Sequence, residues 1–315
     1  MPPSTPHLPD GVQALTGAID DALSLLNGFR KTNAGALLPT SNPSDLLSQC
    51  LDLCAQYRSA ASEPIRTVHH FACTGGTLVT KCIATTPNSQ VLSEVDPLST
   101  QLDQQKPRFA PTDIITQMRQ STQGASQELL IELFLNSIEL VKRDADSRGL
   151  RLVVRDHAHS HYCRGPGIPD RPNLRQILES RFTTLSVLTV RHPLDSFLSL
   201  KGNGWLNFAP QTIDEYSQRY LTFLDAYQGL PVVRYEDLVD SPSTTMQRIA
   251  LHLDLPFFDQ FLELFSAFHL TGDSGRTSDI LEQKPRRQID DDLSDQLKAS
   301  ESYRRLLDAL EYPTH

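Results

Sequence analysis

The chain has 315 residues, of which 39% are hydrophobic and 21% are charged, and its formal net charge is −9. This composition excludes an intrinsically disordered protein and allows one large folded domain. The negative charge argues against a general nucleic-acid or anionic-membrane binder, so an anionic ligand would need a local site.

Five cysteines are scattered along the chain without a CxxC pair, which is typical of reduced thiols in a cytoplasmic protein. The first residues lack the basic and apolar regions of a signal peptide. No run of about 18 apolar residues is present that could span a membrane. We therefore expect a soluble, cytoplasmic protein.

The N-terminal part of the chain predicts a helical extension. Apolar residues recur at helical spacing over 12–26, which indicates an amphipathic helix. Its apolar face would pack on the body of the protein, with a homodimer or partner contact as the alternative. A Pro-, Ser- and Asn-rich stretch at 37–45 indicates a linker. We expect an extension and linker over 1–45 and the main domain over 46–315.

From residue 64 onward, short apolar runs alternate with helical patterns. The runs predict strands at 65–71, 151–155, 185–190 and 231–235. Strands that alternate with helices form a parallel sheet covered by helices on both faces, an α/β fold. Such sheets bind ligands beyond the carboxyl ends of their strands. Functional residues are therefore expected at the ends of the predicted strands.

The segment FACTGGTL, at 71–78, connects a predicted strand to a predicted helix. Its glycines allow a tight turn, and the free N–H groups of the helix start form a site for a phosphate or sulfate. The alternative is a strand–turn–helix junction without a ligand. The Walker A pattern is absent, which argues against an ATP or GTP hydrolase. The candidate anion-binding residues are Cys73, Thr74, Gly75, Gly76, Thr77 and Leu78.

A second candidate anion site follows the strand at 185–190. Arg191 ends that strand, Pro193 suits the first turn of the next helix, and Ser199 lies about two turns further on. A guanidinium and a hydroxyl so placed can hold one phosphate from two sides. The alternative is that Arg191 forms a surface ion pair with Asp195, which would contribute little.

The order and spacing of these two motifs resemble the sulfotransferase family, whose fold is P-loop NTPase-like and whose donor is 3'-phosphoadenosine 5'-phosphosulfate (PAPS). The segments VVRYEDLV at 232–239, SGR at 274–276 and KPRR at 284–287 are similar to segments of that family. The resemblance covers about residues 64–290. It implies that the glycine-rich loop holds the 5'-phosphosulfate and that Arg191 and Ser199 hold the 3'-phosphate. It further implies that Arg276 and Arg286 belong to a loop over the cofactor.

The resemblance also implies candidates for the catalytic base. Arg155-Asp156-His157 resembles the Lys-Thr-His segment of the small-molecule branch, with His157 as the base and Arg155 as a cation near the transferred group. Another branch uses a carboxylate soon after the loop helix, where this chain has Glu94. We favour His157, because a neutral histidine needs little change of pKa to accept a proton near pH 7. The alternatives are that Glu94 binds the acceptor or Arg155, and that His157 is only a hydrogen-bonded strand-end residue.

One residue departs from the family pattern. Cys73 occupies a loop position where the family usually has lysine or arginine, so charge neutralisation falls to Arg155, Lys81 or the loop N–H groups. This departure leaves open a catalytically impaired scaffold that binds PAPS or adenosine 3',5'-bisphosphate. A nucleotide-dependent kinase of related fold is the other alternative. The acceptor would be a hydroxyl of a sugar, a lipid, a small molecule or a protein side chain.

The run HAHSHYC raises the question of a metal site. On an extended strand, His157, His159, His161 and Cys163 would lie on one face. Residues two apart on one strand rarely close around a single ion, and the sequence shows no distant partner cluster. We therefore expect no metal ion.

Overall fold

The computed structural model describes residues 63–99, 112–272, 281 and 286–313. The expected N-terminal helix, the expected domain boundary near residue 45 and the candidate Arg276 all lie outside these ranges.

The centre of the molecule is a five-stranded sheet in which every neighbouring pair of strands is parallel. Its order is β2-β3-β1-β5-β7, so β1 lies in the middle and β2 lies at an edge. A separate two-residue ladder pairs β4 with β6. The strands are β1 (Ile65–His70), β2 (Ser89–Val95), β3 (Arg151–Asp156), β4 (Arg164–Gly165), β5 (Thr184–Val190), β6 (Asn207–Phe208) and β7 (Val232–Arg234).

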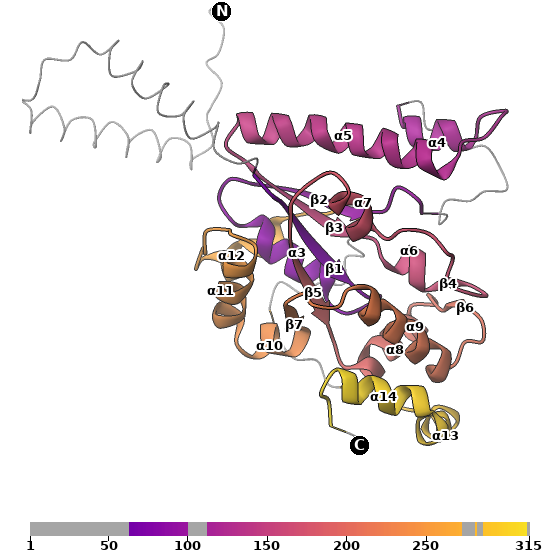
Figure 1. Ribbon diagram of the computed structural model, residues 1–315. Coiled ribbons are helices and arrows are strands. Elements are labelled where there is room, and N and C mark those ends of the chain that lie inside the picture. Colours follow the sequence, from indigo (N-terminus) through magenta and orange to yellow (C-terminus); the bar gives the residue numbers. More distant parts are fainter. Residues whose placement is uncertain (1–62, 100–111, 273–280, 282–285, 314–315) are drawn as a thin grey trace, which may run out of the picture. The chain divides into compact units, whose positions relative to one another are not determined.

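Helices cover both faces of the sheet, which confirms the predicted α/β fold (Figure 1). One face packs against α3 (Gly76–Ala84), α10 (Tyr235–Asp240), α11 (Pro242–His252), α12 (Phe261–Leu264) and the 3-10 turn η1 (Phe265–Ala267). The other packs against α5 (Gln127–Ser147), α7 (Leu174–Glu179), α8 (Pro193–Gly202), α9 (Ile213–Ala226), α13 (Asp291–Ala299) and α14 (Glu301–Ala309). The short helices α4 (Ile114–Arg119) and α6 (His159–Tyr162) lie in connecting segments.

Alternation along the strands explains this layering. Val68 and Val153 pack on the α3 side, whereas Ile65, Leu152 and Val154 pack with α5 and α7 on the other. All five side chains are at most 1% exposed. Residues one apart on a strand point to opposite faces, so apolar residues at successive positions must be covered on both sides.

Local sequence signals fix where several helices begin. Pro193 occupies the first turn of α8, as predicted, and Pro242 occupies the first turn of α11. Proline suits this position because its missing N–H would have no partner within the helix. Ser126 caps α5 by accepting a hydrogen bond from the Leu129 N–H.

The edge strand β2 was not predicted from the sequence. All seven of its residues are only partly buried, so it lacks the apolar run that identifies a central strand. Its register with β3 shifts between Leu92 and Val95, and Glu94 adopts a left-handed backbone with φ of 59°. An irregularity of this kind re-aims a side chain, and here the side chain is that of Glu94.

None of the described helices has the length and apolar character needed to cross a membrane.

A buried polar chain connects the central strands with α9. Asp156 Oδ2 lies 2.8 Å from His69 Nδ1 and accepts a 2.6 Å hydrogen bond from the Tyr227 hydroxyl. The Thr67 hydroxyl lies 2.9 Å from His69 Nε2 and 2.7 Å from the Ser186 hydroxyl. Burying polar groups is costly unless they are hydrogen-bonded, so these contacts stabilise one another.

We expect Tyr227→Phe to lower the free energy of unfolding by about 1–2 kcal/mol, because it removes a donor from a buried carboxylate. Urea denaturation measures this change. Tyr303→Phe is the matched control, since the buried Tyr303 hydroxyl has no hydrogen-bond partner among the described residues. Equal stabilities of the two variants would contradict the stabilising role of the Tyr227 hydrogen bond.

Candidate functional site

A cleft of about 1060 Å³ opens at the carboxyl ends of the strands. The candidate residues from the glycine-rich loop, the β2 edge, the end of β3 and the start of α8 all contribute to its wall. Those that line it are Cys73, Gly75, Gly76, Thr77, Leu78, Glu94, Arg155, His157, Arg191, Ser199 and Arg286. Parallel strands place their following loops at one edge of the sheet, which explains this convergence.

The glycine-rich loop has the geometry of an anion site. Gly75 caps α3 with a φ of 88°, and the first helical hydrogen bond runs from the Val79 N–H to the Gly75 carbonyl. The N–H groups of Gly76, Thr77 and Leu78 therefore have no acceptor inside the helix. These three residues line the cleft, where the positive end of the helix dipole favours an anion.

The two glycines are required by close packing. A Cβ atom on Gly76 would lie 2.3 Å from the His70 ring, and one on Gly75 would lie 2.5 Å from the Tyr235 ring. Gly75 also has a left-handed backbone that other residues adopt only with strain.

Two residues near the loop are used differently from what the sequence suggested. The Thr74 hydroxyl donates to the Phe71 carbonyl at 2.8 Å, and the side chain is fully buried. Lys81 is 3% exposed in α3 and does not line the cleft, whereas Arg155 does. Thr74 therefore offers no hydroxyl to the cleft, whereas Cys73 and the residues from Gly75 to Leu78 line it.

Arg191 and Ser199 line the same cleft as the loop. The Arg191 guanidinium stacks on the Tyr235 ring at 4.4 Å from the ring centroid. Asp195, the partner considered for Arg191, instead pairs with Arg286 through two contacts of 2.8 and 3.0 Å. Arg286 therefore links the start of the C-terminal region to α8.

Arg155 is buried, lines the cleft and is hydrogen-bonded to three side chains. It is 2% exposed and donates from Nε to His70 Nε2 at 3.1 Å and from Nη1 to Ser93 Oγ at 2.9 Å. Its Nη2 donates to Glu94 Oε1. These contacts place the charge of Arg155 against Glu94, so the guanidinium orients the carboxylate.

Glu94 and His157, the two candidate bases, are neighbours. Glu94 Oε2 lies 3.0 Å from His157 Nε2, without an aligned hydrogen bond. Burial alone would raise the pKa of Glu94, but His157 and the charge of Arg155 lower the pKa to about 2. His157 Nε2 also lies 2.9 Å from His159 Nε2. Burial and the neighbouring His157 lower the pKa of His159 to about 3.

His70 has a defined protonation state. Because the Arg155 Nε–H can only donate, His70 Nε2 must accept, which leaves the proton on Nδ1. His70 Nδ1 is 3.0 Å from the Phe71 carbonyl, to which it donates. Burial and the nearby Arg155 lower the pKa of His70 to about 4, so the neutral ring is the stable form.

Several site residues were missed by sequence reasoning. His70 and Ser93 are ordinary strand residues until the fold brings Arg155 between them. Gly272 approaches Glu94 so closely that a Cβ atom there would lie 2.3 Å from Glu94 Cγ. The preceding Thr271 carbonyl accepts a hydrogen bond from Ser93 at 2.9 Å. No local signal could have found these contacts, because residues far apart in the sequence make them.

Trp205, the single tryptophan of the chain, also lines the cleft and is 42% exposed. It follows α8, on the side of the cleft that carries Ser199. The sequence alone does not show whether this ring faces the cleft or packs in the core, and the structure places it at the cleft.

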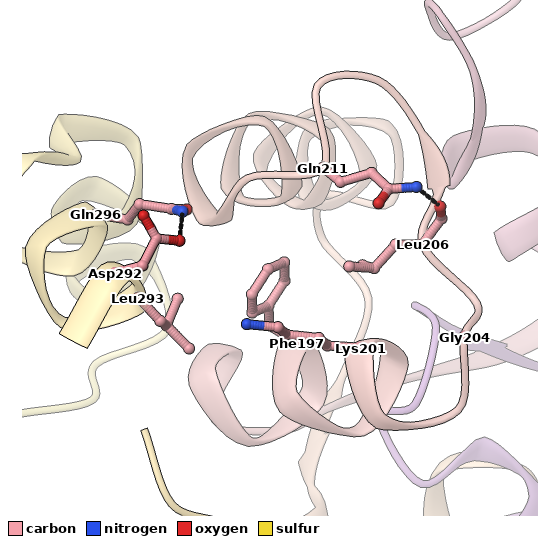
Figure 2. Close-up of a pocket in the computed structure, with 8 residues that line it drawn as sticks. All are labelled: Phe197, Lys201, Gly204, Leu206, Gln211, Asp292, Leu293 and Gln296. Atoms are coloured by element: carbon pink, nitrogen blue, oxygen red, sulfur yellow. Dashed lines mark hydrogen bonds between the residues drawn. The ribbon is translucent and has the colours of Figure 1, made fainter. Parts of the chain in front are cut away.

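A second, smaller pocket of about 340 Å³ lies between the end of α8 and α13 (Figure 2). Its polar side chains are already bonded: Gln296 donates to Asp292, and Gln211 donates to the Leu206 carbonyl. None of the candidate residues lines this pocket, whereas most of them line the larger cleft.

The protonation state of His70 makes stability depend on pH. Below about pH 6.5, the ordinary pKa of histidine, the unfolded chain takes up a proton that folded His70 resists until about pH 4. Stability should therefore fall on acidification across this range, by an amount of the order of 3 kcal/mol for this group. Urea denaturation at a series of pH values, with a metal chelator in the buffer, measures this loss. We expect the stability of His70→Gln, which keeps an acceptor for Arg155, to depend less steeply on pH than that of the wild type. His252→Gln, which replaces an exposed histidine, is the control and should keep the wild-type dependence of stability on pH. The same dependence in His70→Gln as in the wild type would contradict the assignment of a neutral His70.

No family model matches the chain, and no curated protein matches it. Among solved structures, the chain is similar to the sulfotransferase domain from the Synechococcus PCC 7002 olefin synthase, with 18% identity and a TM-score of 0.47. The similarity covers 82% of this chain and 98% of that one. A likeness this slight supports no inference about activity, which must come from the residues of the cleft.

Proposed function

We propose that the protein is a sulfotransferase that moves the sulfuryl group of PAPS to an acceptor hydroxyl. The observation that carries this proposal is that one cleft is bordered both by an anion loop and by a histidine–carboxylate pair. The loop end of α3 and the Glu94–His157 pair line the same space. Donor phosphate and proton acceptor would thus face a common reaction volume.

On the donor side, the N–H groups of Gly76, Thr77 and Leu78 would bind the 5'-phosphosulfate. Arg191 and Ser199 would bind the 3'-phosphate, and stacking on Tyr235 supports this role by fixing the plane of the Arg191 guanidinium. Arg286, which forms an ion pair with Asp195, would lie next to these two residues.

On the acceptor side, His157 would take the proton. Glu94 is already held by Arg155, and a carboxylate beside a guanidinium is a weak base. Glu94 would instead stabilise the imidazolium that forms on His157, as the carboxylate of a catalytic triad does. The acceptor oxygen bonds to sulfur, the bond from sulfur to the bridging oxygen breaks, and adenosine 3',5'-bisphosphate leaves with that oxygen. The proton of the acceptor hydroxyl passes to His157.

Cys73 supplies no positive charge to the leaving phosphate. Arg155, a buried cation that also lines the cleft, is already paired with Glu94. The loop N–H groups and Arg191 would therefore carry most of the charge stabilisation. The proposed transfer needs no metal ion, because the donor is activated by its own leaving group.

Calorimetric titration with adenosine 3',5'-bisphosphate, beside AMP and ATP, tests the donor site. We expect micromolar binding that depends on the 3'-phosphate and is weakened at least about 10-fold by Arg191→Ala, because a charged hydrogen bond contributes about 1.5–3 kcal/mol. The matched control is Arg148→Ala, which removes an exposed arginine at the far end of α5. Binding that is indifferent to the 3'-phosphate would overturn the proposal.

The proposed base is tested by release of the bisphosphate from PAPS in the presence of a phenol, an alkanol, a sugar and a tyrosyl peptide. We expect His157→Ala to lower the transfer rate by about 100-fold or more while bisphosphate affinity is retained. Glu94→Gln should lower the rate less. A wild-type chain that binds the bisphosphate but transfers to no acceptor would favour the non-catalytic scaffold, and equal rates in His157→Ala and wild type would exclude His157 as the base.

A further inference from the structure

Three potential metal ligands meet on one wall of the cleft. Glu94 comes from the bulged end of β2, His157 follows β3, and His159 is the first residue of α6. One carboxylate oxygen and two ring nitrogens lie within 4.8 Å of one another. The sequence offered the two histidines without a distant partner, and the fold supplies that partner as Glu94.

The distances are close to those of a coordination shell. His157 Nε2 lies 2.9 Å from His159 Nε2 and 3.0 Å from Glu94 Oε2. Ligands about 2.0–2.1 Å from a tetrahedral ion are about 3.3 Å apart, so an opening of a few tenths of an ångström would admit the ion. The two rings meet edge to face, with centroids 3.9 Å apart. Two ring nitrogens that face each other can share only one proton, whereas an ion would use both lone pairs.

The carboxylate is prepared for a second partner. Arg155 donates to Oε1 of Glu94, while Oε2 is buried and has no aligned hydrogen-bond donor among the described residues. Around metal sites, the carboxylate oxygen that does not bind the ion usually accepts a hydrogen bond, which orients the oxygen that does. Glu94 is also fixed by Gly272, whose backbone packs against its side chain.

We propose that Glu94 Oε2, His157 Nε2 and His159 Nε2 bind one divalent transition-metal ion of the zinc class. All three residues line the cleft, so the fourth coordination position faces it. Two imidazoles and a carboxylate suit Zn²⁺ or Co²⁺ and are a poor set for Mg²⁺, which requires oxygen ligands. The positive charge of Arg155 opposes the ion and limits its affinity.

The other two members of the HAHSHYC run take no part in this site. The chain turns into α6 at His159, so the expected strand alternation ends there. His161 Nε2 bonds to the Pro169 carbonyl at 3.0 Å, and Cys163 is 2% exposed in the core beside α9.

A bound ion would occupy the side of His157 that faces Glu94 and would remove the carboxylate that stabilises its protonated form. Zinc should therefore suppress sulfuryl transfer, a consequence that rests on the proposed function. The binding of the ion does not rest on it, so the two proposals can fail separately.

The test is calorimetric titration of chelator-treated, full-length protein with Zn²⁺, together with the visible absorption of the Co²⁺ form. We expect one ion per chain at this site and a tetrahedral Co²⁺ spectrum. His159→Ala and Glu94→Gln should each weaken binding by about 100-fold or more. The exposed-histidine variant His252→Ala should bind like wild type.

Circular dichroism of the metal-free variants checks that they are folded. If His159→Ala does not fold, His159→Gln takes its place. The rise of the unfolding temperature caused by zinc is then compared between wild type and Glu94→Gln, and a smaller rise in Glu94→Gln supports the proposed site. Zinc binding that survives in both His159→Ala and Glu94→Gln would place the ion elsewhere and overturn the proposal, as would an absence of binding in wild type. Bisphosphate titration of the same samples reports separately on the donor site.

Discussion

The candidate site depends on the hydrogen bonds that the buried guanidinium of Arg155 makes. A charge taken out of water is costly unless it is paired and fully hydrogen-bonded, so its partners must be held in place. Those partners are His70 at the end of β1 and Ser93 and Glu94 at the end of β2, while Arg155 itself belongs to β3. One side chain therefore fixes the carboxyl ends of three adjacent strands, and the neutral His70 ring that it holds packs directly against Gly76 of the anion loop.

The parts of the fold that depend on local signals could be predicted from the sequence. Strands such as β3 and β5 contain short apolar runs, and Pro193 and Pro242 mark helix starts whatever the rest of the chain does. The edge strand β2 could not be predicted, because half-exposed residues and a bulge at Glu94 remove the pattern by which a strand is recognised. Its presence follows from pairing with β3, which is a long-range property.

The same division holds for the site. The rule that parallel strands collect their loops at one edge correctly brings the glycine-rich loop, Arg155 and Arg191 to one cleft, although their roles remain predictions. The side-chain contacts that determine the chemistry of the site could not be predicted from the sequence. That Glu94 lies against His157, and that Asp195 pairs with Arg286 and leaves Arg191 to stack on Tyr235, depends on side-chain packing between distant segments. The metal interpretation of HAHSHYC assumed an extended strand, which was wrong from His159 onward because the chain becomes helical there.

The position of Trp205 gives this protein an internal optical probe. The chain has a single tryptophan, and its partly exposed indole lies at the cleft and not in the core. Its emission therefore carries no background from other indoles and is sensitive to the polarity of one place in the molecule. Any ligand that displaces water beside this ring changes the colour or intensity of the light the whole protein emits, so occupancy of the cleft can be followed in unlabelled protein.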